Sequence, residues 1–149
     1  MKILLAIDDS KFSEAAIQAV IAQAHSKDTE VRVLHVVEPP TLLVARDMGG
    51  SDLALLEAVW DEETKQAQAL VAKTAERLRS HGMKVTTAVQ QGNPKSMIID
   101  ASEEWHADLI VLGSHGRKAL DRFMMGSVSE AIARHAHCSV EIVRIPSDR

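Results

Sequence analysis

The chain has 149 residues, 46% of them hydrophobic and 26% charged, which is an ordinary composition for one globular domain spanning residues 1–149. With 17 Lys and Arg residues against 21 Asp and Glu residues, the formal net charge is −4, so no basic footprint indicates nucleic-acid binding. The apolar runs are too short for a signal-peptide core or a membrane span, and the single cysteine excludes an internal disulfide, so we expect a cytoplasmic protein.

Strand and helix patterns alternate along the first part of the chain. Residues 3–7 form a continuous apolar run, which is typical of a parallel strand covered on both faces, and residues 8–10 supply turn and cap side chains. Apolar residues at helical spacing then predict a helix over 12–24. The β-branched residues of 31–37 predict a second strand.

The middle of the chain combines a loop, a long helix and a third strand. Residues 41–51 mix apolar and charged side chains with two glycines and predict an exposed loop, with a lid or a partner-docking surface as alternatives. A long helix follows over 52–80, and His81-Gly82 ends it before a strand at 83–89. The inner face of this helix is predicted to consist of Leu55, Leu56, Val59, Leu70, Val71, Ala75 and Leu78.

The last part of the chain predicts two further strands and two further helices. Residues 92–94 (Gly-Asn-Pro) are typical of a turn, an N-cap and a first helical residue in that order. A strand is predicted over 109–112, a helix over 127–135 and a fifth strand over 140–145.

Five strands alternating with four helices predict an α/β fold: an open five-stranded parallel sheet, Rossmann-like, with right-handed crossovers and helices on both faces. In such sheets ligands bind beyond the carboxyl ends of the strands, where the strand order reverses. We therefore expect Asp8, after the first strand, and Gly113, after the fourth, to be neighbours in one site. Asp8 could instead be a turn residue, while Asp9 and Ser10 are interpreted as turn and N-cap residues.

The segment most favourable to a ligand reads Gly113-Ser114-His115-Gly116, nine residues, then Gly126-Ser127-Val128-Ser129. Glycines after a buried strand would let the backbone approach a bulky anion, and a helix starting at Ser127 would present free N–H groups and a positive dipole end. The pattern predicts a nucleotide site. A competing interpretation is a capping box in which Ser127 caps the helix and Glu130 reaches back.

These residues resemble the nucleotide motif of the universal stress protein family, in its ATP-binding branch. The resemblance spans nearly the whole chain and is most specific over residues 108–117. It implies a strand order of 3-2-1-4-5 and homodimers that pair through the edge strand, Val140 to Ile145. It also implies that Asp8 lies by the ribose and adenine and that Val36 contacts the adenine.

The full ATP-binding set implied by the resemblance extends from the first strand to the last helix. Its members are Ala6, Ile7, Asp8, Val36, Gly113, His115, Gly116, Arg117, Gly126, Ser127, Val128 and Ser129. The chain departs from many relatives at Ala119 and at Asp121, where a carboxylate facing the site would weaken polyphosphate binding.

No P-loop motif is present, so we expect no rapid phosphoryl transfer and assign no catalytic residue. His135 and His137 are two residues apart, which points them to different helix faces, and we predict no protein metal site, although Asp8 and triphosphate oxygens would suit Mg²⁺. The leading hypothesis is an ATP-binding stress-response regulator that acts as a homodimeric nucleotide-dependent switch. The alternatives are a slow ATPase or nucleotidyl-transferring enzyme assisted by His115, and a nucleotide-free dimeric interaction module whose glycines merely build a turn.

Overall fold

The structure is a computed structural model that describes residues 1–23, 27–39, 53–116 and 125–146. Strands and helices alternate along it, as the sequence predicts. The elements are β1 (Lys2–Ala6), α1 (Lys11–Ala22), β2 (Glu30–Val37), α3 (Leu53–Ser80), β3 (Lys84–Gln91), α4 (Pro94–Glu104), β4 (Leu109–Gly113), α5 (Ser127–His135) and β5 (Ser139–Val143). The predicted loop at 41–51 lies outside the described residues.

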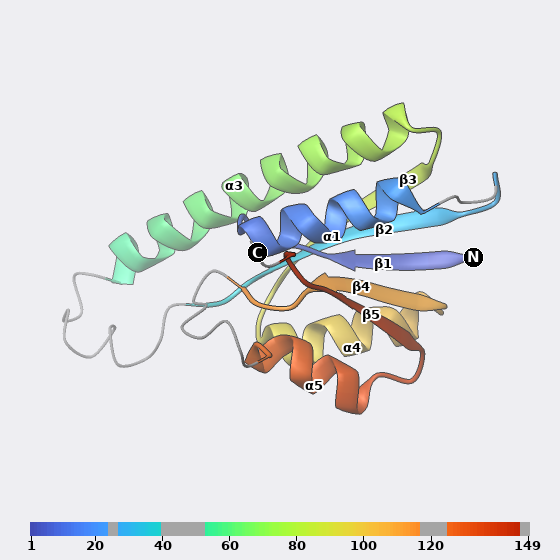
Figure 1. Ribbon diagram of the computed structural model, residues 1–149. Helices are drawn as coiled ribbons and strands as arrows, with labels where there is room; N and C mark the ends of the chain where they lie inside the picture. Colours follow the sequence, from blue (N-terminus) through green and yellow to red (C-terminus); the bar gives the residue numbers. More distant parts are fainter. Residues whose placement is uncertain (24–26, 40–52, 117–124, 147–149) are drawn as a thin grey trace.

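All five strands are parallel, and their order is β3-β2-β1-β4-β5, so the predicted topology is confirmed. Helices α1 and α3 cover one face of the sheet, and α4 and α5 cover the other (Figure 1). Each face has its own apolar core because alternate residues of a strand point to opposite sides. Leu5 and Val33 belong to the core under α1 and α3, whereas Leu4 and Leu34 belong to the core under α4 and α5.

The helix ends follow local side-chain chemistry. Ser10 is the N-cap of α1 and accepts a 3.2 Å hydrogen bond from the Ser13 N–H, and Asn93 caps α4 by accepting a 2.9 Å bond from the Lys95 N–H. Gly82, with a φ of +85°, adopts the left-handed conformation that ends α3. These three assignments agree with the sequence-based expectations.

The predicted capping box at α5 is wrong. The N-cap is Gly126, which has no side chain to make a capping bond, and Ser127 is the first helical residue. The helix therefore begins one position earlier than a Ser127 cap requires, and Glu130 instead pairs with Arg134 one turn further along, at 2.9 Å. The Ser127 side chain is exposed and is not needed to start the helix.

The predicted inner face of α3 holds only for its C-terminal half. Val71, Ala75 and Leu78 are buried, but Leu55 is 53% exposed and Val59 is 45% exposed. The reason is that the first turns of α3 extend past the carboxyl ends of the strands, where the sheet offers no surface to cover them (Figure 1). Within the described ranges, no helix is both long and apolar enough to cross a membrane.

Candidate functional site

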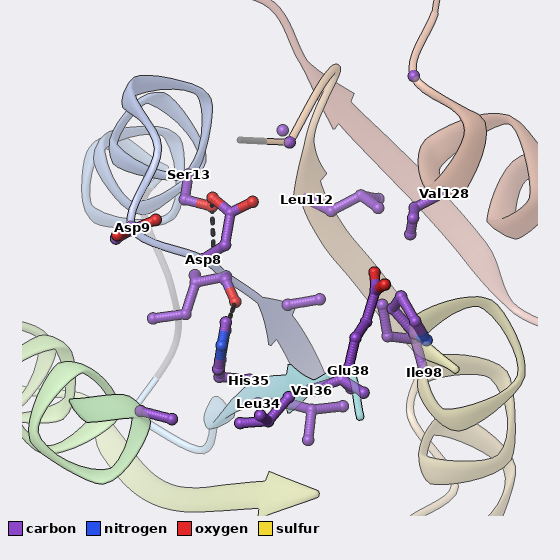
Figure 2. Close-up of a pocket in the computed structure, with 18 of the residues that line it drawn as sticks. Asp8, Asp9, Ser13, Leu34, His35, Val36, Glu38, Ile98, Leu112 and Val128 are labelled. Atoms are coloured by element: carbon purple, nitrogen blue, oxygen red, sulfur yellow. Dashed lines mark hydrogen bonds between the residues drawn. The ribbon is translucent and has the colours of Figure 1, made fainter. Parts of the chain in front are cut away.

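A cavity of about 940 Å³ lies at the carboxyl ends of β1, β2 and β4. Its walls also include the first turns of α4 and α5 and one side of α3, and Figure 2 shows Ile98, Leu112 and Val128 facing it from α4, β4 and α5. The predicted residues that line it are Ala6, Ile7, Asp8, Val36, Gly113, His115, Gly116, Gly126, Ser127, Val128 and Ser129. Arg117, with Ala119 and Asp121, lies outside the described residues.

Asp8 holds the turn between β1 and α1. Its Oδ1 accepts a 2.9 Å hydrogen bond from the Ser10 N–H. Asp8 also makes two bonds with Ser13: Oδ1 accepts from the Ser13 hydroxyl at 2.9 Å, and the Asp8 N–H donates to Ser13 Oγ at 2.8 Å (Figure 2). The other carboxylate oxygen, Oδ2, faces Gly116, where an added Cβ would lie 3.1 Å away. One oxygen of Asp8 thus serves the turn and the other faces the loop after β4, so the two strand ends are neighbours as expected.

Gly113 and Gly126 do not have the role that the sequence predicts for them. A Cβ on Gly113 would lie 2.7 Å from the backbone carbon and oxygen of Phe12, so this glycine lets α1 pack against the end of β4. A Cβ on Gly126 would lie 3.0 Å from Ser114 O and 3.1 Å from His115 Cα. At each glycine, the position that a Cβ would take is occupied by other backbone atoms of the protein. These glycines therefore permit close backbone packing within the site rather than an open approach for an anion.

The first turn of α5 opens toward the cavity. The Glu130 N–H bonds to Gly126 O at 2.9 Å, which closes the first helical turn, and the preceding N–H groups of Ser127, Val128 and Ser129 have no intrahelical acceptor. The Ser129 side chain is 2% exposed, and its hydroxyl donates to Ser114 O at 2.8 Å. Ser129 can therefore offer a ligand its backbone N–H but not its hydroxyl.

Val36 presents a backbone edge to the same cavity. The last pair between β1 and β2 is Ala6 with Leu34, whereas β2 and β3 remain paired through Val37. The Gly92 N–H bonds to Val37 O on the β3 side, so the N–H and C=O of Val36 point to the other side, beyond the end of β1. A donor and an acceptor are thus exposed side by side where β1 stops.

His35 also lines the cavity, although the sequence pattern does not predict it as a site residue. Its ring nitrogen Nδ1 lies 2.6 Å from Ile7 O, across the end of β1 (Figure 2). A histidine inside an apolar strand was the available signal, but its partner depends on the register between two strands. His115, which was singled out, contacts Ser114 Oγ through Nδ1 at 2.9 Å, and its ring lies 4.9 Å from the Phe12 ring.

The cavity is rich in carboxylates. Asp8, Asp9, Glu38 and Glu63 line it, and no Lys or Arg does so among the described residues. A bound polyphosphate would therefore depend on the α5 N–H groups, on the dipole of that helix and on cations from elsewhere. In the described ranges no three His, Cys, Asp or Glu side chains gather closely enough to hold a metal ion.

The sequence matches the model of the universal stress protein family over residues 1–144. A universal stress protein of Methanocaldococcus jannaschii is 33% identical over 145 residues, which cover 97% of this chain and 82% of that protein. A putative universal stress protein of Staphylococcus aureus is 34% identical over 152 aligned residues, which cover 98% of this chain and 87% of that protein.

Solved structures give the same picture. The universal stress protein UspA of Lactobacillus plantarum has a TM-score of 0.83 with 25% identity and covers 97% of both chains. A family member from Arabidopsis thaliana, solved with AMP bound, has a TM-score of 0.66 with 17% identity and covers 100% of this chain and 94% of its own. Another universal stress protein was solved in complex with cAMP and has a TM-score of 0.66 with 18% identity, covering 97% of this chain and 96% of its own.

Proposed function

Because the chain belongs to the universal stress protein family, we propose that it is a regulatory protein that binds an adenine nucleotide, with ATP as its main ligand. The observation that carries this proposal is the pairing of two backbone features on one cavity. Val36 offers an N–H and a C=O at the end of β2, and the first turn of α5 offers N–H groups at the positive end of a helix dipole.

The first feature suits a purine base and the second suits phosphates. An adjacent donor and acceptor match the N1 acceptor and the 6-amino donor of adenine, and Ile98, Leu112 and Val128 supply apolar surface for the ring. Two proteins of this fold hold AMP and cAMP, which supports an adenine nucleotide here. The role proposed for Asp8 is to face the ribose with the oxygen that the turn does not use.

The expected affinity is in the micromolar range. A hydrogen bond to a charged group contributes about 1.5–3 kcal/mol, and three such bonds from the α5 N–H groups together with adenine burial reach the ~8 kcal/mol of a micromolar complex. Because the described cavity wall is acidic, Mg²⁺ or the basic residues Arg117, Lys118 and Arg122 would have to balance the phosphate charge.

The proposal includes a homodimer that pairs through β5. This strand bonds to β4 on one side and ends the sheet on the other, and such an edge is a template for pairing with a second copy. Nucleotide binding at the neighbouring end of β4 would then change the stability of the dimer. The switch is tested by sedimentation velocity with and without ATP, and a sedimentation coefficient that ATP leaves unchanged contradicts it.

The binding test is isothermal titration with ATP, ADP and AMP, using protein shown to be free of bound nucleotide. The informative variant is Ser127→Asp, because a carboxylate on the first residue of α5 stabilises the helix while it repels phosphate. Ser127→Ala is its matched control, since the exposed hydroxyl caps nothing. We expect Ser127→Asp to weaken the binding of ATP at least about tenfold and the binding of AMP by less. Equal ATP affinity in the two variants would contradict the phosphate site.

A further inference from the structure

The hydrogen bond from His35 to Ile7 takes the place of a backbone hydrogen bond between β1 and β2. Nδ1 lies 2.6 Å from Ile7 O, and since a carbonyl oxygen only accepts, Nδ1 carries the proton and donates it. The bond therefore requires a hydrogen on Nδ1. Figure 2 shows the ring of His35 directed at the chain that follows β1.

The other hydrogen bonds between β1 and β2 identify which backbone bond is replaced. At the start of the two strands, the Glu30 N–H donates to Met1 O at 2.9 Å, and at their end the Ile7 N–H donates to Leu34 O at 2.9 Å. Advancing Met1 and Glu30 by six residues each gives Ile7 and Val36, so a regular parallel ladder would continue with Val36 N–H to Ile7 O. Among the described residues that bond is not made, and the His35 ring takes the carbonyl instead.

We propose that His35 is a positioning residue for the nucleotide base: by occupying the Ile7 carbonyl, it keeps the Val36 N–H free to donate to the purine. This inference rests on the proposed function. Without the ring, Ile7 O would be an unpaired acceptor next to the Val36 N–H, and the two would close the ladder. Closing it would remove the donor from the cavity and leave the Val36 C=O as the only base-binding group of that edge.

The consequence is selectivity for the N1 position of the base. Adenine N1 accepts a hydrogen bond, so it pairs with a free Val36 N–H, while the 6-amino group pairs with the Val36 C=O. The analogue 1-deaza-ATP has a C–H in place of N1 and cannot accept, although its 6-amino group and phosphates are intact. The ratio of the two affinities therefore reports whether the Val36 N–H is available.

The matched variants are His35→Leu and His35→Asn. The Asn side-chain NH₂ occupies nearly the place of His Nδ1 and can donate to Ile7 O, whereas Leu cannot donate. In the nucleotide-free protein, amide hydrogen exchange at Val36 is expected to be fast in the wild type and in His35→Asn. It is expected to slow at least about tenfold in His35→Leu, because the amide becomes bonded within the sheet. A protected Val36 amide in the wild type would overturn the inference whatever the nucleotide does.

Titration then tests the role in binding. We expect the wild type to prefer ATP over 1-deaza-ATP by about 3- to 10-fold, the ratio that one neutral hydrogen bond provides. His35→Leu should weaken ATP binding by that factor and leave the affinity for 1-deaza-ATP unchanged. His35→Asn should keep the wild-type ratio of the two affinities. Equal weakening of both ligands in His35→Leu would show a purely structural role and overturn the inference. If the Val36 amide exchanges rapidly and no adenine nucleotide binds the wild type, the proposed function is wrong. The conclusion that His35 keeps the Val36 N–H out of the sheet would still hold in that case.

Discussion

Gly113 at the end of β4 and Phe12 in the first turn of α1 are in backbone contact so close that a Cβ on the glycine would lie 2.7 Å from the Phe12 carbonyl carbon and oxygen. The contact joins the two chain segments that form one side of the cavity. Gly113 is thus required for the packing of α1 against β4.

Gly113→Ala should consequently destabilise the protein without any nucleotide present. We expect a loss of about 2 kcal/mol or more in the free energy of unfolding, because backbone atoms have to move to accommodate the methyl group. Gly116→Ala is the matched control, since its Cβ would meet only Asp8 Oδ2, at 3.1 Å, and a small shift of this side-chain oxygen accommodates the methyl group. Urea unfolding measures the free energy of unfolding of both variants. Equal values would show that a methyl group on residue 113 is tolerated next to Phe12 as well as one on residue 116.

Ser129→Ala should lower stability and leave nucleotide affinity nearly unchanged. The lost hydroxyl bonds to Ser114 O at 2.8 Å in a buried setting, so its removal should destabilise the protein by about 1–2 kcal/mol. The backbone N–H of residue 129, which is the group proposed to bind phosphate, remains in the variant. Thermal unfolding and ATP titration of the folded variant test this, and a selective loss of ATP binding would assign the hydroxyl to the ligand.

The ion pair between Glu14 and Arg77 connects α1 to α3 and should make a small, pH-dependent contribution. Two hydrogen bonds of 2.8 and 2.9 Å join the groups, and the bond from Arg77 lowers the pKa of Glu14 below its ordinary value. Since the pKa is lower in the folded protein than in the unfolded chain, the stabilisation is present above the ordinary value of 4.5 and is lost as the pH falls through the folded value.

Both side chains are partly exposed, at 51% for Glu14 and 35% for Arg77, so the effect is limited by solvent screening. We expect Glu14→Gln to reduce the free energy of unfolding by less than about 1 kcal/mol at pH 7 and by a smaller amount at pH 3. Urea unfolding at the two pH values measures this. A difference from the wild type that is as large at pH 3 as at pH 7 would show that packing, not charge, carries the contribution.

Truncations along α3 should have unequal effects on stability. Leu78 is fully buried, and Leu78→Ala should destabilise by about 2–5 kcal/mol, whereas Leu55→Ala, at a position 53% exposed, should change stability by less than about 0.5 kcal/mol. A large loss in the free energy of unfolding for Leu55→Ala would mean that the first turns of α3 are covered in solution. If the denaturant midpoint also depended on protein concentration, a second copy of the chain would be what covers them.

The strands and helices could be predicted because their sequence signals are local, whereas the strand order was implied by the family resemblance. A continuous apolar run such as residues 3–7 is typical of a covered parallel strand, and Asn93-Pro94 begins a helix by its own chemistry. The exposed part of α3 was not predictable, because apolar spacing continues through Leu55 and Val59 and does not reveal where the sheet ends.

The described residues of the predicted site lie together around the cavity at the strand ends, but the contacts that each of them makes were less predictable. Whether Gly113 faces a ligand or Phe12 depends on how α1 crosses β4, which no local pattern specifies. The bond from His35 to Ile7 likewise depends on the register of β1 against β2. Sequence motifs identified which segments meet, whereas the individual contacts came from the packing.

The carbonyl of Ser114 receives both the Gly126 N–H and the Ser129 hydroxyl, each at 2.8 Å. The start of α5 is therefore bonded directly to the end of β4, by groups that lie outside the interval 117–124 that separates them in the sequence. A change of charge within that interval therefore leaves the donors and the acceptor of these two bonds in place. The charge near the site and the joint between α5 and β4 are thus set by different residues.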